Sequence, residues 1–472
     1  MSQPDLVVLV HGTFAGAESD VGDKWWQRES ECWNSLRARL PEGVELPDDR
    51  RLFRWSGENS ERERVKASYE LLEHLQELEA DGLKYHLVGH SHGGSVIWGA
   101  LRLATLQNIA LPGLASWATV GTPFLHLRSR NAFSAANILN SAVALVFLVA
   151  GFRRLCKFLY TLGRAIVDSE YGVDVWNFKT GQGQPFLEYV FLTPEGWLLL
   201  GLTLGAIFLF LQLGGLFLGP VVEARRMQRE ARLEERAMAL FGDRWLGLWS
   251  PDDEAILGLR ATVNLSLSFV GRITRRDRVF FSDRFNILSG VYHWTVAPTF
   301  NWLLRPYLDR AVASYVKKSA QGNNRPAADV VDVSVAPLSG DDLATAPSIP
   351  DVLNRKIVDR ANQHATNLVP QLRTLLGEAS FVNGMTALGS SFSGKELVHT
   401  SYFDHDEVLE LLAMHIAKLK ADDEFLWRRL ATHPDLLHWL RGFHERAEQS
   451  VATISLSRRQ RRAAEIESRK AA

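Results

Sequence analysis

The chain has 472 residues, of which 46% are hydrophobic, and its 53 basic and 54 acidic side chains leave a net charge of -1. This balance excludes a mainly disordered protein and provides no basic surface for nucleic acid, so we expect no nucleic-acid partner. Two cysteines, Cys32 and Cys156, are too few for a disulfide framework or a cysteine-based zinc site, and we expect no metal. The first residues have no basic segment before the first apolar run, so we expect no signal peptide.

The first 120 residues alternate predicted strands with predicted helices. Apolar runs predict four strands, at Leu6–Val10, Leu52–Trp55, Tyr85–Val88 and Trp117–Val120. Leucines at helical spacing predict one helix over Glu61–Glu79, and a second helix is predicted over Ser95–Leu106. Strands that alternate with helices indicate a mostly parallel sheet, so the predicted fold class is α/β.

Two charge-free stretches follow the fourth strand, at Phe133–Phe152 and Trp197–Val222. The second stretch has 26 consecutive uncharged residues, when about 20 suffice to cross a bilayer. We therefore expect a hairpin of two membrane helices, the alternative being a buried hairpin of a soluble core. Seven basic residues flank the hairpin on the outside against three just inside it, which favours a cytoplasmic main body.

These features divide the chain into four predicted parts. Residues 1–130 form the first half of a core, 131–236 an insertion with the hairpin, 237–445 the second half of the core, and 446–472 a basic tail. The tail is predicted to be a solvated helix, with contact to a membrane surface as the alternative.

The sequence Gly89-x-Ser91-x-Gly93 lies between a predicted strand and a predicted helix. In that position the pattern indicates a nucleophile elbow, a sharp turn that exposes the serine hydroxyl above the sheet. The two glycines permit the tight backbone. We therefore predict Ser91 as a catalytic nucleophile.

An oxyanion that forms at this serine needs hydrogen-bond donors. The backbone N–H of His92, directly after Ser91, is one expected donor. The second donor normally comes from the loop after an early strand, where we favour Thr13 and keep Phe14 as the alternative.

A serine is a weak nucleophile until a base removes its proton, so an acid and a histidine are expected further along the chain. The apolar run Trp245–Trp249 predicts a strand that leads into two aspartates. We favour Asp253 over Asp252 as the acid. Either side chain is also suited to cap a helix that begins near Glu254.

The sequence contains 14 histidines, and most of them must be structural. His399 ends a short apolar run and precedes a helix predicted to begin near Asp406, so we favour it as the base over His405. His90 is too constrained by the elbow to act as the base but suits the wall of the site. His86, in the middle of a strand, is expected in the core.

Together the HGTFA turn, the YHLVGHSHGG elbow, the TVGTPF strand end, the SPDDEAI acid loop and the LVHTSYF histidine loop resemble α/β-hydrolases of the lipase and esterase kind. These motifs span about residues 5–130 and 240–420. The resemblance implies a parallel sheet flanked by helices and a Ser-His-Asp mechanism without a cofactor. It also implies a lid inserted after the strand that ends at Gly121, where this chain carries its two charge-free stretches.

We therefore expect a membrane-anchored serine hydrolase that cleaves carboxylic esters of lipids, as a phospholipase A or a glycerolipid lipase does. Its expected partners are the lipid bilayer and a membrane lipid substrate. The sequence leaves three alternatives open: a thioesterase or protein deacylase, a non-catalytic membrane scaffold, and an antibacterial lipase toxin delivered to another cell. The last alternative would involve a delivery or immunity protein as a further partner.

Overall fold

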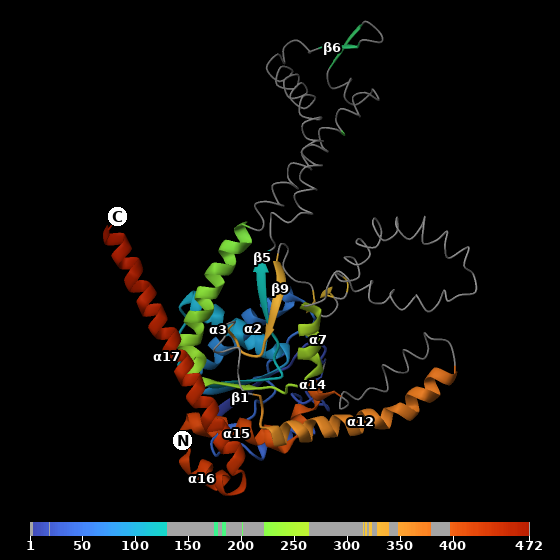
Figure 1. Ribbon diagram of the computed structural model, residues 1–472, viewed down its shortest axis with the longest axis vertical. Coiled ribbons are helices and arrows are strands. Elements are labelled where there is room, and N and C mark those ends of the chain that lie inside the picture. Colours follow the sequence, from blue (N-terminus) through green and yellow to red (C-terminus); the bar gives the residue numbers. More distant parts are fainter. Residues whose placement is uncertain are drawn as a thin grey trace, which may run out of the picture. The chain divides into compact units, whose positions relative to one another are not determined.

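The structure is a computed structural model (Figure 1). It describes residues 3–17, 19–129, 174–177, 182–185, 201, 221–263, 315, 317–318, 321–322, 328–338, 348–378 and 397–471. The chain divides into two compact units, one made of Met1–Leu127, Arg229–Arg325 and Val330–Ala472, the other of Arg128–Gln228 and Pro326–Asp329.

The two predicted hairpin helices, Phe133–Phe152 and Trp197–Val222, fall almost entirely outside the described residues. They remain a prediction from the sequence. Within the parts of the chain that are described, no helix combines the length and the apolar composition needed to cross a membrane.

The first unit is built on a five-stranded sheet in the order β2-β1-β3-β4-β8, and every neighbouring pair is parallel. The strands are β1 (Asp5–Val10), β2 (Val44–Glu45), β3 (Tyr85–His90), β4 (Leu114–Val120) and β8 (Trp245–Leu248). All six residues of β3 are buried, and so are five of the six in β1, as expected for a sheet covered on both faces. The predicted α/β class is therefore confirmed.

Helices cover both faces of this sheet. Figure 1 shows α2 (Glu61–Ala80) and α3 (His92–Gln107) on one side and α15 (Asp406–Lys420) on the other. In α2 the leucines of the predicted stripe are all buried, from Leu71 to Leu78, which explains why this charge-rich segment forms a helix against α3.

The predicted strand at Leu52–Trp55 is wrong. This segment forms no strand, and the short β2 at Val44–Glu45 pairs with the edge of β1 instead. Two of its side chains are nevertheless buried, those of Phe53 and Trp55, and Nε1 of Trp55 donates a hydrogen bond to the His11 carbonyl at 2.7 Å. Its apolar side chains serve packing rather than strand pairing.

Other elements complete the described residues. They are α1 (Glu31–Arg37), β5 (Phe124–Ser129), β6 (Asp174–Asn177), β7 (Gln182–Pro185), α7 (Glu254–Val263), β9 (Ala328–Ser334), α12 (Asp351–Glu378), α14 (Val398–Ser401), α16 (Asp423–Thr432), α17 (Pro434–Ala471), 3₁₀ turns at Gly242–Arg244 and Tyr402–Asp404, and a helix over 221–241. Strand β5 pairs with β9, and β6 pairs with β7. Residues 446–471 of the predicted tail are helical as expected, but they continue α17 without a break.

Parallel strands end at one edge of a sheet, and that edge is where sites form in α/β folds. Here β1 leads into His11, β3 into Ser91, β4 into Gly121 and β8 into Ser250. The sheet thus brings four chain segments together that lie far apart in the sequence.

A buried pair of histidines joins α15 to α17. Nδ1 of His415 lies 2.8 Å from Nε2 of His444, and the two rings stack with centroids 5.0 Å apart. Burial lowers the pKa of both rings, that of His444 to about 3 with a further contribution from Lys418. Both rings are therefore neutral in the folded protein at neutral pH.

This pair makes stability depend on pH. An unfolded histidine titrates near pH 6.5, so below that pH the unfolded chain takes up protons that the folded chain does not. We predict that the free energy of unfolding falls as pH drops from about 6.5 towards 3, by up to about 1.4 kcal/mol per pH unit for each histidine. Urea unfolding across this window measures the slope. His444→Gln should flatten it, whereas His438→Gln, at an exposed position of the same helix, should not; equal slopes in the two variants would contradict the prediction.

Candidate active site

Ser91 occupies a strained turn between β3 and α3. Its backbone has φ 53° and ψ -134°, a combination that side-chain-bearing residues rarely adopt. The flanking glycines leave room for it: a Cβ on Gly89 would lie 2.6 Å from the Gly94 nitrogen, and one on Gly93 would lie 2.1 Å from the Val10 carbonyl oxygen. The structure thus has the backbone geometry expected of a nucleophile elbow at this position.

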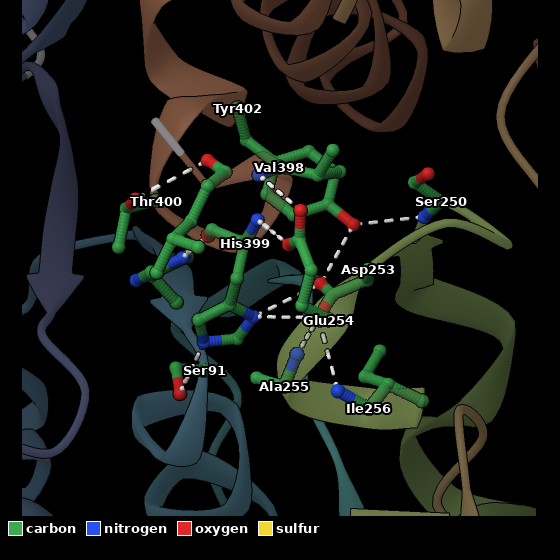
Figure 2. Close-up of polar contacts among 12 residues, drawn as sticks. Ser91, Ser250, Asp253, Glu254, Ala255, Ile256, Val398, His399, Thr400 and Tyr402 are labelled. Atoms are coloured by element: carbon green, nitrogen blue, oxygen red, sulfur yellow. Dashed lines mark hydrogen bonds and ion pairs between the residues drawn. The ribbon is translucent and has the colours of Figure 1, made fainter. Parts of the chain in front are cut away.

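Three predicted residues meet in one chain of hydrogen bonds (Figure 2). Ser91 Oγ lies 2.9 Å from Nε2 of His399, and Nδ1 of His399 lies 3.0 and 2.9 Å from the two carboxylate oxygens of Asp253. The hydroxyl donates to Nε2 when Nδ1–H donates to the carboxylate. This arrangement places a base within reach of a hydroxyl, and an acid behind the base.

Asp253 is fully buried at the start of α7. Its Oδ1 accepts hydrogen bonds from the backbone N–H groups of Ala255 and Ile256, each at 3.0 Å. Burial raises the pKa of this carboxyl, but the hydrogen bond and charge of His399, together with the other donors, outweigh burial and lower the pKa below its ordinary value. Asp253 therefore caps the helix and faces His399 at once, two uses that the sequence presented as alternatives.

The neighbouring Asp252 points elsewhere. It is exposed, and its Oδ2 accepts a hydrogen bond from Nδ2 of Asn354 at 2.8 Å. Of the two aspartates weighed from the sequence, the structure brings only Asp253 to His399.

The main chain of His399 is held on two sides. His399 lies in the four-residue helix α14 rather than in an open loop. The carboxylate of Glu254 accepts the N–H of Val398 at 3.2 Å and that of His399 at 3.3 Å, and Nε2 of His90 donates to the His399 carbonyl at 2.8 Å. Burial and the nearby charge of His399 lower the pKa of His90 to about 3, so its ring is neutral and acts as a donor only through one nitrogen.

His405, the alternative base, is placed differently. It is buried at the N-terminus of α15, where its carbonyl accepts the N–H of Val408 at 3.0 Å. Among the described contacts, none joins its ring to Ser91.

The turn after β1 approaches Ser91 closely. A Cβ on Gly12 would lie 2.6 Å from Cβ of Ser91, so a side chain there is excluded. The N–H of Phe14, the alternative oxyanion donor, is already bonded to the Gly57 carbonyl at 2.8 Å. Within the described residues, the N–H groups of Thr13 and His92 have no backbone acceptor, and these two remain the predicted donors.

Three features of this site were not predicted from the sequence: Tyr402, Glu254, and His90 as a donor to His399. Tyr402 is fully buried, and its hydroxyl lies 2.9 Å from Oδ2 of Asp253. It belongs to the same LVHTSYF motif as His399, but a tyrosine three residues after a histidine has no recognisable pattern. Gly121, with φ 55°, makes room for it, since a Cβ there would lie 2.8 Å from Cε2 of Tyr402.

In the part of the chain that is described, no cluster of three or more histidine, cysteine, aspartate or glutamate side chains is arranged to hold a metal ion. Comparison of the chain with protein families, with curated proteins and with solved structures gives no match. The fold, a parallel sheet flanked by helices, defines an α/β protein.

The contact between Asp253 and His399 leads to a test of the predicted role of Ser91 as a nucleophile. Asp253→Asn should slow the labelling of Ser91 by a fluorophosphonate roughly 10³- to 10⁴-fold, because an amide favours the wrong imidazole tautomer. Asp252→Asn is the matched control and should label as fast as the wild type. The reverse result would assign the acid to Asp252.

Proposed function

We propose that this protein is a serine hydrolase that cleaves carboxylic esters through an acyl-enzyme. The observation that carries the proposal is the continuous hydrogen-bonded chain from Ser91 through His399 to the buried Asp253. A strained serine at a strand–helix turn adds support, because a nucleophile elbow has this backbone and here the hydroxyl lies within reach of His399.

The proposed reaction has two halves. Ser91 Oγ attacks the acyl carbonyl carbon while His399 Nε2 takes its proton, and Asp253 stabilises the imidazolium that results. The N–H groups of Thr13 and His92 stabilise the oxyanion, and His399 then returns the proton to the leaving alcohol. Water, deprotonated by His399, attacks the acyl-enzyme and releases the carboxylic acid and free Ser91.

We further propose that the ester belongs to a membrane lipid, as in a phospholipase A or a glycerolipid lipase. The support comes from the sequence, where charge-free stretches occupy the segment between β5 and β8. Phe14 adds to it, because this large apolar side chain is 82% exposed on the turn that approaches Ser91. An exposed phenylalanine two residues after Gly12, whose backbone approaches Ser91, suits an acyl chain better than a polar substrate.

The substrate class is tested with the purified full-length protein in detergent. We predict that it releases free fatty acid from diacyl phospholipid or triacylglycerol, measured by mass spectrometry, and that Ser91→Ala abolishes the release because nothing else at the elbow forms the acyl-enzyme. His405→Ala is the control and should keep its activity. Deacylation of an acylated peptide without lipid hydrolysis would instead assign the site to a thioesterase or protein deacylase.

Membrane anchoring is tested separately. We predict that alkaline carbonate leaves the protein with the membrane pellet, because a spanning helix is held by apolar burial. Replacing residues 131–224 by a short Gly/Ser linker should move the protein to the supernatant while it still hydrolyses a soluble p-nitrophenyl ester, since Ser91, Asp253 and His399 lie outside the cut. A full-length protein that stays in solution without detergent would refute the anchor.

A further inference from the structure

The hydroxyl of Tyr402 makes two hydrogen bonds in the interior, directly behind the acid (Figure 2). It lies 2.8 Å from the backbone nitrogen of Ser250 and 2.9 Å from Oδ2 of Asp253. A backbone N–H only donates, so the phenol oxygen accepts from Ser250. The single phenol proton therefore points at Asp253, and the direction of that hydrogen bond is fixed.

The two oxygens of Asp253 have different partners. Oδ1 accepts from the N–H groups of Ala255 and Ile256 as well as facing His399. Oδ2 faces His399 and Tyr402, and the described residues supply it with no other donor. Tyr402 is thus the group that competes with His399 for the charge on Oδ2.

The phenol keeps its proton at neutral and alkaline pH. Burial raises the pKa of Tyr402 well above its ordinary value, and the negative charge of Asp253 raises it further. Tyr402 also follows His399 by three residues, while Ser250 lies two residues after the end of β8. One hydroxyl therefore connects the turn of the base, the acid and the end of a strand.

We propose that Tyr402 is a positioning residue that acts through Asp253: its hydroxyl fixes Oδ2 and draws off part of the carboxylate charge, which sets the strength of the hydrogen bond between Asp253 and His399. The proposal rests on the proposed function, because it concerns the same base and acid. The strength of the hydrogen bond between Asp253 and His399, however, can be measured in the resting protein, without any turnover of substrate.

The measurement is the proton NMR resonance of the His399 Nδ1–H in the full-length protein, assigned by its loss in His399→Gln. In Tyr402→Phe the carboxylate loses a donor and becomes a stronger acceptor for the imidazole proton, so the resonance should move further downfield. Tyr85→Phe is the matched control. Tyr85 is fully buried and donates to Glu79 Oε1 at 2.8 Å, but it lies at the other end of β3 from Ser91. Its variant should leave the resonance in place.

A second variant tests the same interaction in the opposite direction. Fluorotyrosine at position 402 has a more acidic phenol and is a stronger donor, so it should move the resonance upfield. It keeps both hydrogen bonds, and so it remains informative if Tyr402→Phe does not fold. Because Tyr402→Phe also frees the carboxylate to rotate away from His399, the kcat for a p-nitrophenyl ester should fall about tenfold with KM unchanged.

The outcomes separate the two proposals. If Tyr402→Phe leaves the resonance where Tyr85→Phe leaves it, or moves it upfield, the phenol has a structural role only and this inference is wrong. The inference is also wrong if fluorotyrosine at position 402 does not move the resonance upfield. If the resonance moves as expected while the wild type hydrolyses no ester, the proposed function fails and the action of Tyr402 on Asp253 stands.

Discussion

The rest of the site depends on how the buried carboxylate of Asp253 is satisfied. An ionised carboxylate away from water is unfavourable unless hydrogen bonds compensate for the lost hydration. Here the compensating donors come from three places: the first turn of α7, the ring of His399 and the phenol of Tyr402. Because each donor has to be in position for the carboxylate to remain charged, folding of the acid loop also fixes the histidine turn beside it.

The parallel sheet supplies the frame in which this becomes possible. Its strands end at the same edge, so the turns after β1, β3, β4 and β8 lie close together although they are far apart in the sequence. The approach is tight enough that side chains are excluded at Gly12, Gly93 and Gly121. The backbone strain at Ser91 is maintained by this packing, since the turn is enclosed by β1 on one side and by its own helix on the other.

Much of this architecture was predictable from the sequence because its signals are local. Continuous apolar runs located β1, β3, β4 and β8, and the turn residues after them located Ser91 and Asp253. The strand predicted at Leu52–Trp55 was wrong because apolar composition does not distinguish an unpaired segment with buried side chains from a paired strand. Tyr402 escaped prediction for another reason: its partner Asp253 lies 149 residues away, and nothing in either local pattern records the pairing.

The contacts that hold the histidine turn also determine which mutations it tolerates. Glu254 and His90 bind the peptide groups of Val398 and His399, and a peptide group is the same whatever side chain it carries. The hydrogen bond to Glu254 therefore excludes proline at position 398, because proline has no N–H. Which other residues fit at this position depends on packing alone. Sequence variation at that position is thus compatible with an unchanged placement of the imidazole, so a different residue there would give no sign that the imidazole had moved.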